Sequence, residues 1–448
     1  MNIYLHVEVS IRELDSKILL AVLAASKGHQ VIISDLNTLK KGLFNGLLSP
    51  GIFHTKSLTP NDEKMGIHQA LVNNGFKITS IDEEGGLLEQ GYSGFAKIRY
   101  SEQSIKQASA IFGWGDEDTD SLKKIYSKHS DKIYKTGSPR VDLWRSNFSK
   151  YWNSQQMNLS KPFLLVSSNL YLANFQKPFF EWGGFKSIKF KKGKNFFQTD
   201  PMLFKKQFFN VAEDYHKLVS FIEAINHLAN LNRGFDIVLR PHPLENVEAW
   251  KKYLYGIPNV HVIREGSINS WVNNAFAVMH NSCTTALEAT VSKKPLVTYI
   301  PFKQEHAWEI PNKLGYQVYS LEDLSATVNR LFDESKSVEN KDYDDKLPKI
   351  LSEKLYIDND ELAAEKMIKI WESINTNFVS SNLIKFQWYL KIMNLQNLLR
   401  KAPSYPKFPA LNKKNISEKI NSLKSILGIN QNFECKILSD RTILIKKV

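Results

Sequence analysis

The chain has 448 residues and a formal net charge of +13, and 42% of its residues are hydrophobic. This length exceeds what one hydrophobic core usually organises, so we expect two domains. The longest apolar runs fall short of the roughly 18 residues that a membrane span needs. Two cysteines are too few for a disulfide framework. The N-terminus has the pattern of a strand rather than of a secretory leader, so we expect a reducing, cytoplasmic location.

Strand and helix patterns alternate in the first third of the chain. We expect strands at 3–9, 31–34, 77–81, 108–112 and 132–136, and helices at 14–26, 62–74 and 118–127. Gly28 and Gly75 stand where the first two of these helices should stop. A strand, a helix and a strand at this spacing form a βαβ unit, so the pattern predicts a parallel sheet in a first domain of residues 1–150.

A polar and aromatic stretch at 145–161 has no clear period and marks the predicted domain boundary. Beyond it we expect strands at 162–167, 235–239, 260–263, 277–279 and 295–299, and helices at 205–231, 284–291, 322–332 and 362–374. The aromatic and lysine-rich segment 175–202 is expected to form a loop over the ligand cleft. The fold class is therefore α/β, with a second domain at 160–375 and a C-terminal extension at 376–448.

The C-terminal extension accounts for most of the net positive charge. It has thirteen basic residues against three acidic ones, which leaves an excess of ten positive charges. Two interpretations stay open: a solvated basic surface, or a patch that faces anionic lipid or a lipid-linked acceptor. Nucleic-acid binding is disfavoured because no recognition motif accompanies the charge.

An acidic run follows the strand expected at 77–81. Asp82, Glu83 and Glu84 are consecutive, and the glycines after them allow a sharp backbone turn. Carboxylates held close together raise the pKa of at least one of them, which suits general acid–base chemistry. A solvated acidic turn has the same pattern, so both interpretations stay open.

Two turns in the second domain offer groups for a phosphate, because ligands of open α/β sheets bind beyond the carboxyl ends of the strands. Arg240 and His242 follow the strand expected at 235–239, in a turn stiffened by Pro241 and Pro243. A cation and an imidazole at a strand end can hold a phosphate. The alternative is a rigid loop whose histidine bonds within the protein.

The second of these turns leads into the helix expected at 284–291. It carries hydroxyl groups on Ser282, Thr284 and Thr285, and the free N–H groups and dipole of a helix N-terminus favour an anion. Glu288, one turn inside the helix, is placed to accept bonds from ribose hydroxyls. Ordinary capping of the helix by Ser or Thr is the alternative.

The order of these motifs resembles that of the bacterial sialyltransferases of GT-B fold. An acid-acid-Gly motif at 83–85 is followed by a His-Pro motif at 242–243 and a Ser/Thr motif at 282–285. The stretches 8–15 and 137–142 look more like the bacterial surface carbohydrate biosynthesis proteins, which are related to the β-Kdo transferases. The resemblance covers about residues 1–330 and implies two Rossmann-like domains whose parallel sheets face a central cleft.

The resemblance also implies a donor of the CMP–ulosonic acid kind, such as CMP-Kdo or CMP-sialic acid. Carried over, His242 and the turn at 282–285 would hold the phosphate and cytidine. Glu84, with Glu83 as second choice, would be the base of an inverting enzyme or the nucleophile of a retaining one. The related Kdo enzymes carry Asp where this chain has Glu84, which leaves that choice open. CMP leaves as a monophosphate, so we expect neither a metal nor a cofactor.

The carboxylate of such a donor sugar needs a partner of its own. Arg12 and Arg140 are candidates, because a guanidinium group binds a carboxylate bidentately. Glu13 would orient Arg12 or bind acceptor hydroxyls. For Arg12, a plain position at the start of a surface helix is the alternative.

The sequence therefore predicts a glycosyltransferase that moves an ulosonic acid, Kdo-like or sialic-acid-like, from a CMP-activated donor to a cell-surface glycan precursor. Its partners would be the sugar nucleotide, a glycan or lipid-linked glycan acceptor, and an anionic membrane at the inner face, with no nucleic acid. Two enzyme alternatives share the fold: a CDP-dependent glycerophosphotransferase and a nucleotide-sugar epimerase that uses UDP. A non-catalytic glycan-binding scaffold is the third alternative.

Overall fold

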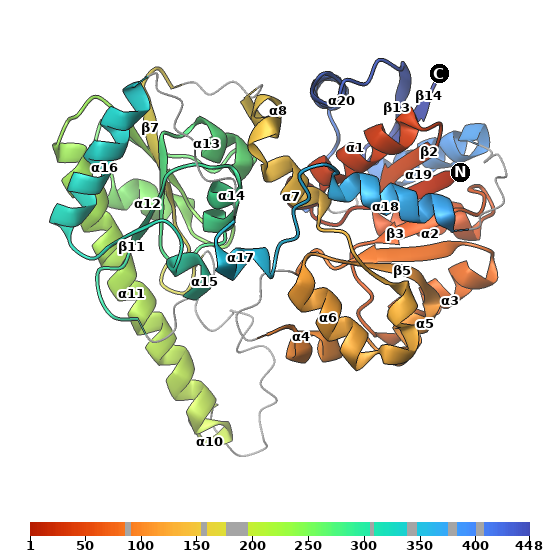
Figure 1. The fold of residues 1–448 in the computed structure, drawn as a ribbon, viewed down its shortest axis with the longest axis horizontal. Helices are drawn as coiled ribbons and strands as arrows, with labels where there is room; N and C mark the ends of the chain where they lie inside the picture. Colours follow the sequence, from red (N-terminus) through yellow and green to blue (C-terminus); the bar gives the residue numbers. More distant parts are fainter. Residues whose placement is uncertain are drawn as a thin grey trace. The chain divides into compact units, whose positions relative to one another are not determined.

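The computed structural model describes residues 1–85, 91–153, 159–175, 196–304, 309–337, 347–374, 383–399 and 407–448. The chain divides into two compact units (Figure 1). The first unit comprises Met1–Tyr151 and Pro348–Val448, and the second comprises Trp152–Leu347. Each unit has its own sheet and its own hydrophobic core.

The sheet of the first unit has eight strands among the described residues, in the order β13-β14-β2-β1-β3-β4-β5-β6. Its strands are β1 (Asn2–His6), β2 (Gln30–Ser34), β3 (Ile52–Thr55), β4 (Lys77–Ile81), β5 (Ala108–Gly113), β6 (Ile133–Lys135), β13 (Phe433–Ser439) and β14 (Thr442–Lys447). Strands β1 to β6 pair in parallel. The C-terminal hairpin is the exception, because β14 pairs antiparallel with both β13 and β2.

The described part of the first unit also contains helices. They are α1 (Ser10–Ser26), α2 (Leu36–Phe44), α3 (Asp62–Asn73), α4 (Tyr92–Arg99), α5 (Glu102–Gln107), α6 (Asp116–Ile125), η1 (Ser127–Lys132), α7 (Pro139–Trp144), η2 (Ser146–Phe148), α8 (Ser149–Asn153, which runs into the second unit), α17 (Lys349–Ser352), α18 (Ala363–Ser373), α19 (Leu383–Leu399) and α20 (Lys413–Leu427). Helix α1 is buried over most of its length because α7, α18 and α20 contact it. It ends where Gly28 takes a φ of 88°, which a residue with a Cβ adopts with strain.

Among its described residues, the second unit has a six-stranded sheet in the order β12-β11-β10-β7-β8-β9, and all of its strand pairs are parallel. The strands are β7 (Phe163–Ser167), β8 (Asp236–Arg240), β9 (Val260–Val262), β10 (Ala277–His280), β11 (Leu296–Tyr299) and β12 (Tyr316–Val318). The described helices are α10 (Phe196–Thr199), α11 (Pro201–Asn230), α12 (Val247–Tyr253), α13 (Ile268–Asn274), α14 (Thr285–Val291), α15 (Glu309–Asn312) and α16 (Leu321–Lys336).

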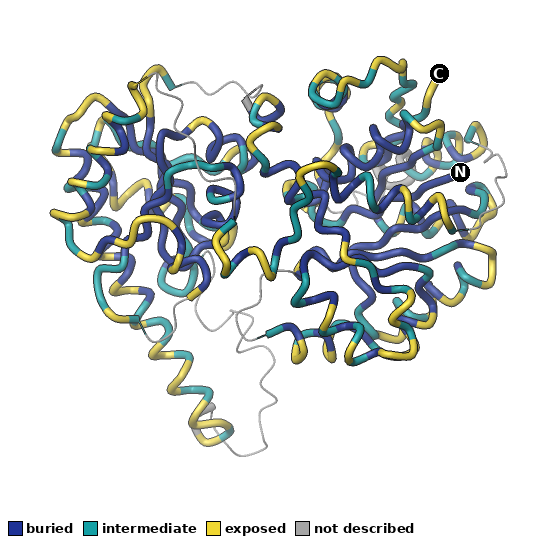
Figure 2. The backbone as a smooth tube through the Cα atoms, in the orientation of Figure 1, coloured by how far each residue is buried: buried dark blue, intermediate teal, exposed yellow. Residues whose placement is uncertain are grey.

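The cores lie on the faces of the sheets, as Figure 2 shows by the dark strands in each unit. Every residue of β1 is buried, with Ile3 and Leu5 on one face and Tyr4 on the other. Burial on both faces is characteristic of parallel sheets that carry helices on each side.

The predicted fold class, α/β with two Rossmann-like parallel sheets, is confirmed. The strand predicted at 77–81 coincides with β4. The chain passes from the first unit to the second between Tyr151 and Trp152, inside the stretch predicted as a boundary. The chain returns to the first unit at Pro348, however, rather than continuing in the second to residue 375. Most of the loop predicted at 175–202 lies outside the described residues.

Two contacts explain the early return to the first unit. The backbone N–H groups of Ala363 and Ala364, at the start of α18, donate to the carboxyl of Asp142 at 3.0 and 2.9 Å. Farther along the chain, β14 adds to the edge of β2. Helix α18 and the predicted extension are therefore parts of the first unit.

Candidate active site

In the sheet of the first unit, the strand order reverses between β1 and β3. In parallel sheets of this order, ligands bind at the carboxyl ends of the two strands that flank the reversal. Two charged side chains lie there: Glu8 follows β1, Lys56 follows β3, and Lys56 Nζ is 2.5 Å from a carboxylate oxygen of Glu8. Lys407 Nζ approaches the other oxygen at 3.1 Å. Although partial burial raises the pKa of Glu8, hydrogen bonds from Lys56 and Lys407 lower it to about 2.

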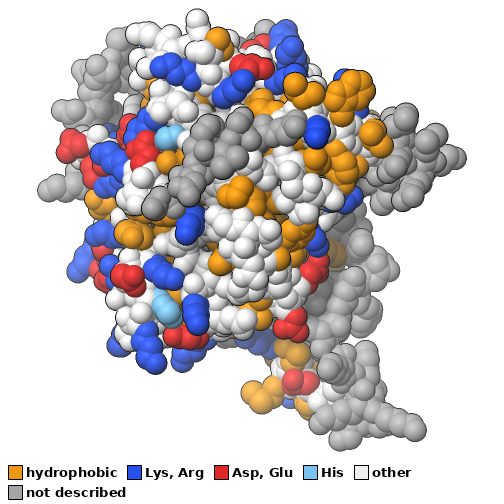
Figure 3. Space-filling model, turned by 90° about the vertical axis from the view of Figure 1, so that its right-hand side faces the viewer, with side chains coloured by type: hydrophobic (Ala, Val, Ile, Leu, Met, Phe, Trp, Pro, Cys, Tyr) orange, Lys and Arg blue, Asp and Glu red, His pale blue; other side chains and the backbone are white. Residues whose placement is uncertain are grey.

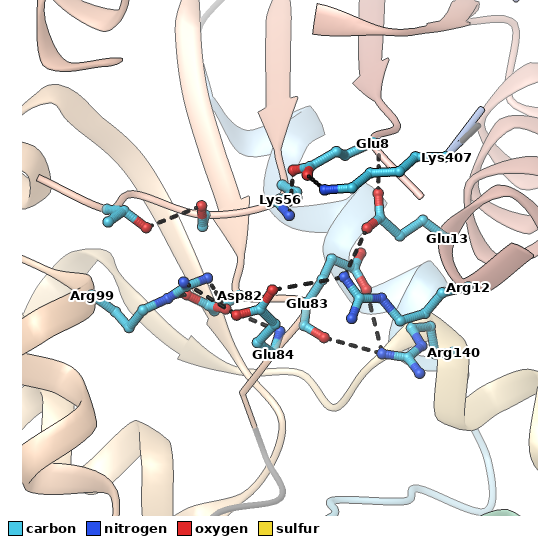
Figure 4. A network of polar contacts seen from close by, with 12 residues as sticks. Glu8, Arg12, Glu13, Lys56, Asp82, Glu83, Glu84, Arg99, Arg140 and Lys407 are labelled. Atoms are coloured by element: carbon cyan, nitrogen blue, oxygen red, sulfur yellow. Dashed lines mark hydrogen bonds and ion pairs between the residues drawn. The ribbon is translucent and has the colours of Figure 1, made fainter. Parts of the chain in front are cut away.

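The acidic turn of Asp82, Glu83 and Glu84 follows β4, next to β3 in the sheet. Its three carboxyl groups have different surroundings (Figure 4). Asp82 is buried and forms a bidentate pair with the guanidinium of Arg99, at 2.8 and 2.9 Å. Burial raises the pKa of Asp82 more than Arg99 lowers it. Asp82 also accepts the backbone N–H of Glu84 at 3.0 Å, so it shapes the turn.

Glu83 points into the protein. Its carboxylate lies 2.8 Å from Nζ of Lys17 on α1, and both side chains are almost completely buried. The Arg140 guanidinium is 3.9 Å from the second carboxylate oxygen and donates to the Glu83 carbonyl at 3.1 Å. Burial raises the pKa of Glu83, but the charges of Lys17 and Arg140 outweigh it and lower the pKa below its usual value.

Glu84 is the acid of this turn that faces solvent, with 45% of its side chain exposed. Arg12 approaches one carboxylate oxygen at 3.8 Å and Arg99 approaches the other at 3.3 Å. Figure 4 shows the carboxylate between the two guanidinium groups. A carboxylate that is both accessible and flanked by cations can contact a substrate while the same cations bind an anionic group beside it.

The residues predicted to bind a carboxylate divide into accessible and buried ones. Arg12, near the start of α1, is about one third exposed and pairs with Glu13 at 3.2 Å. Glu13 is fully buried and also accepts the backbone N–H of Glu8 at 2.8 Å, so it orients Arg12 and joins the cluster to the end of β1. Arg140 is only 14% exposed, and its guanidinium lies 5.5 and 5.7 Å from the ring centroids of Trp114 and Trp144.

In the sheet of the second unit the strand order is that of a Rossmann fold, and it reverses between β7 and β10. The expected ligand site is therefore at the carboxyl ends of these two strands. The turns after both strands are bonded to each other. Asn169 Nδ2 donates to the carbonyl of Ser282 at 2.7 Å, and the Ser167 hydroxyl donates to Thr285 Oγ1 at 3.1 Å. Strand β8, which is followed by the segment that holds His242, pairs with β7 in the same sheet.

Ser282 is held in an uncommon backbone conformation, with φ at 51°. Asn312 fixes it, because its Oδ1 accepts the Ser282 N–H at 2.6 Å and its Nδ2 donates to the Ser282 hydroxyl at 3.1 Å. Thr285 is buried beside Ser167 and Cys283. Thr284 is exposed at the start of α14 and makes no capping bond with its side chain. Of the three predicted hydroxyls, Thr284 is therefore the one presented at the surface.

His242 is positioned by Glu245, which is fully buried. The Glu245 carboxylate accepts the His242 N–H at 3.2 Å, the Ser168 hydroxyl at 2.9 Å and the Trp250 indole N–H at 2.5 Å. Burial raises the pKa of Glu245, and these donors oppose that effect. The carboxyl group thereby fixes the turn after β8 against the turn after β7.

Burial, with a contribution from the charge of Arg264, lowers the pKa of His242 to about 4. The imidazole is therefore neutral at pH 7. Its Nδ1 lies 3.3 Å from the backbone N of Leu244 and accepts that N–H, which assigns the ring proton to Nε2. His242 thus offers an anion a hydrogen-bond donor rather than a positive charge, and the nearby cation is Arg264.

Arg240 makes its bonds within the protein. Its guanidinium donates to the carbonyls of Glu265, Arg264 and Gly266 at 2.6, 3.2 and 2.9 Å, and burial lowers its pKa to about 10. Glu288 is buried and lies close enough for its charge to act on Arg240. Both residues are buried, so we expect them to shape this site rather than to contact a ligand.

Several residues that complete these clusters have no motif of their own in the sequence. They are Lys17, Lys56, Arg99, Glu245, Arg264 and Asn312. A basic residue at helical spacing inside an apolar helix, as at Lys17, is the signal that indicates a buried partner. Glu245, three residues after His242, could have been found as the acid of a helix-start turn. Among the described residues, no group of three His, Cys, Asp or Glu side chains is placed to hold a metal ion.

No protein-family model matches the chain, and no match is found among curated proteins. Solved structures with a similar fold include the UDP-GlcNAc 2-epimerase of Methanocaldococcus jannaschii in complex with UDP-GlcNAc and UDP, with 12% identity, a TM-score of 0.44, and coverage of 83% of this chain and 99% of that one. The UDP-GlcNAc 2-epimerase of Neisseria meningitidis bound to UDP-GlcNAc gives the same values. The wall teichoic acid polymerase TagF has 10% identity, a TM-score of 0.41, and coverage of 72% of each chain. Similarities this weak carry no conclusion about activity.

Proposed function

We propose that this protein is a glycosyltransferase that moves an ulosonic acid from a CMP-activated donor to a glycan precursor, with Glu84 as its reacting carboxylate. The observation that carries the proposal is the setting of Glu84. Its carboxylate is accessible, and the guanidinium groups of Arg12 and Arg99 lie on either side of it. An acidic sugar brings a carboxylate of its own, and a guanidinium group is the side chain best matched to it.

The three acids of the turn divide the work. Asp82 is committed to Arg99 and Glu83 to Lys17, both in buried pairs. Only Glu84 of the three can reach a substrate without breaking such a pair. Arg12 is the accessible guanidinium and the better candidate for the donor carboxylate, whereas Arg140, packed near Trp114 and Trp144, fits a supporting role.

For the nucleotide we propose the turns after β7, β8 and β10 of the second unit. His242 would donate from Nε2 to a phosphate oxygen, and Thr284 would add its hydroxyl. Arg264, whose charge acts on His242, would supply the positive charge that the neutral imidazole lacks. Because CMP leaves with a single phosphate group and so carries less charge than a nucleoside diphosphate, we propose that these groups offset that charge and that turnover is metal-independent.

The first test is a calorimetric titration of the full chain with CMP, CDP, UDP and CMP-Kdo, in the presence of a chelator. Binding of CMP and CMP-Kdo in preference to the diphosphates supports the proposal. Binding of CDP or UDP alone would replace it with the glycerophosphotransferase or epimerase alternative. Binding without release of CMP in the presence of a range of glycan acceptors would favour the non-catalytic scaffold.

A further inference from the structure

Helix α19 is fixed to the first unit along one face. Phe386 and Leu390 are buried in the core of that unit together with Leu43 and Leu48. Phe386 packs so closely on α2 that a Cβ at Gly42 would lie 2.6 Å from its ring. The helix is therefore held in one orientation, and its opposite face has a defined direction.

That opposite face carries an exposed apolar stripe. Ile384, Trp388 and Ile392 are 72%, 62% and 54% exposed, respectively. Their spacing of four residues aligns them on one side of the helix. We name these three residues the α19 stripe. Three large apolar side chains in a row on a surface helix mark an interaction site more often than isolated ones do.

The charges around the stripe are positive. Helix α19 contains no acidic residue, and exposed Lys385 and Lys391 flank the stripe, with Nζ of Lys391 5.0 Å from the ring centroid of Trp388. The segment from residue 376 onwards, to which α19 belongs, has an excess of ten positive charges. In Figure 3, which looks onto the first unit, hydrophobic side chains gather on part of the face with Lys and Arg side chains beside them.

We propose that α19 lies flat on an anionic lipid surface, with the α19 stripe inserted among the headgroups and the lysines in contact with them. An apolar stripe beside basic residues is the pattern of helices that lie in a membrane interface. Tryptophan favours this depth because its ring is apolar and its N–H is polar. Exposed Lys385 and Lys391 match the charge of anionic headgroups.

A second copy of the chain is the competing occupant, and charge argues against it. A symmetric contact through the stripe would bring two basic surfaces together, and like charges across an interface oppose association. Among the described helices, none is long and apolar enough to cross a bilayer. Interfacial binding through α19 depends on neither the donor nor the acceptor, so it stands apart from the proposed catalytic function.

The test is co-sedimentation of the full chain with vesicles that mix phosphatidylethanolamine and phosphatidylglycerol, compared with vesicles of phosphatidylcholine. We expect binding to the anionic vesicles that weakens as salt is added. The triple variant Ile384→Gln, Trp388→Gln, Ile392→Gln should bind them on the order of tenfold more weakly. Because all three side chains are exposed, the variant should keep the circular dichroism spectrum and melting temperature of the parent.

A matched control replaces another exposed aromatic residue, Phe209 on α11 of the second unit, with Gln. It should bind the vesicles like the parent. Equal binding by the triple variant and the parent, or no binding by the parent, overturns the proposal. Sedimentation velocity separates the competing occupant: a parent dimer that the triple variant abolishes, with vesicle binding unchanged, would assign the stripe to a second copy.

Discussion

Lys17 Nζ lies 2.8 Å from a carboxylate oxygen of Glu83, and both side chains are withdrawn from solvent. The pair joins α1 to the turn after β4, two segments separated by 66 residues in the sequence. Its opposite charges compensate each other where neither could be hydrated. A carboxylate bound in this way supports the turn, and it separates the role of Glu83 from that of Glu84, one residue further on and half exposed.

The pair gives a stability prediction. Glu83→Gln leaves the Lys17 ammonium buried without its counter-charge, and breaking a buried pair in this way costs about 3–5 kcal/mol. Urea denaturation should therefore show a lower free energy of unfolding by that amount. The matched control is Glu63→Gln. The Glu63 side chain is 82% exposed, and its ion pair with Lys40 is long, at 3.8 Å. This change should alter the free energy of unfolding by less than about 0.5 kcal/mol.

A second variant distinguishes an ion pair from simple packing. Replacing both partners, with Lys17→Met and Glu83→Leu, removes both charges together and should recover most of the lost stability. The pKa of Glu83 is lowered in the folded state, so its stabilising effect is present at neutral pH and is lost as the pH falls through the carboxylate range. If Glu83→Gln were as stable as the parent at pH 7, the pair would not hold the turn.

Glu84 gives the catalytic prediction. Glu84→Gln keeps the shape of the side chain but removes the charge and the basic oxygen, so CMP release in the presence of donor and acceptor should fall by about 10²–10⁴-fold. The affinity for CMP should stay within a factor of about two, because we assign the nucleotide to the second unit. The melting temperature should also be unchanged, since the side chain is half exposed. Turnover that survives this change would rule out Glu84.

His242 gives the nucleotide-binding prediction. His242→Ala removes the Nε2–H donor, and a hydrogen bond to a charged phosphate contributes about 1.5–3 kcal/mol, so the dissociation constant for CMP should rise about 10- to 100-fold. His261→Ala is the control, because His261 lies in the same unit and pairs with Asp236 at 3.0 Å. Calorimetry should show no change in CMP affinity for the control.

The pKa of His242, about 4, adds a pH dependence to this comparison. Between pH 8 and pH 7 the imidazole stays neutral, so the ratio of dissociation constants between His242→Ala and the parent should be constant. As the pH falls towards 4, the parent gains a positive charge that the variant lacks, and the ratio should increase. The phosphate of CMP itself titrates at about pH 6, so the test of the neutral donor is made between pH 8 and pH 7, where the phosphate is mostly a dianion. A ratio that changes between pH 8 and pH 7 would contradict the neutral-donor assignment.

The sequence predicted most of the parallel strands because they are buried on both faces and read as short apolar runs. It missed β3, where His54 and Thr55 interrupt the run although both are buried. That omission also concealed Lys56, which meets Glu8 only because β1 and β3 are neighbours in the sheet. Such proximity comes from strand order, which local patterns do not encode.

Motif positions were easier to predict than the partners of each side chain. The sequence placed Arg240 and His242 in one turn, but could not show that Arg240 bonds to three carbonyls around Gly266. Nor could it show that burial leaves His242 neutral. The choice of Glu84 over Glu83 rested on the resemblance, and it is the buried Lys17 that gives it a physical reason.

The last prediction concerns the C-terminal hairpin of β13 and β14. The sequence suggested that residues 376–448 are an extension added to the two domains, but β14 belongs to the sheet of the first unit. Strand β14 pairs with β2 through Ile443, Leu444 and Ile445, which are buried. Removing residues 433–448 would expose these contacts and leave β2 as an open edge, which promotes aggregation. We expect the truncated chain to melt at a lower temperature and to aggregate at low salt without any membrane present.

The same argument decides which variant can test membrane binding. Deleting everything after residue 376 would remove β14, α19 and α20 together, so loss of the protein from a membrane fraction would reflect unfolding as much as lost lipid contact. The hairpin and the α19 stripe are separable, because substitutions in the stripe leave the buried face at Phe386 and Leu390 intact. A truncated chain that kept the melting temperature and solubility of the parent would show that β14 contributes little to the sheet.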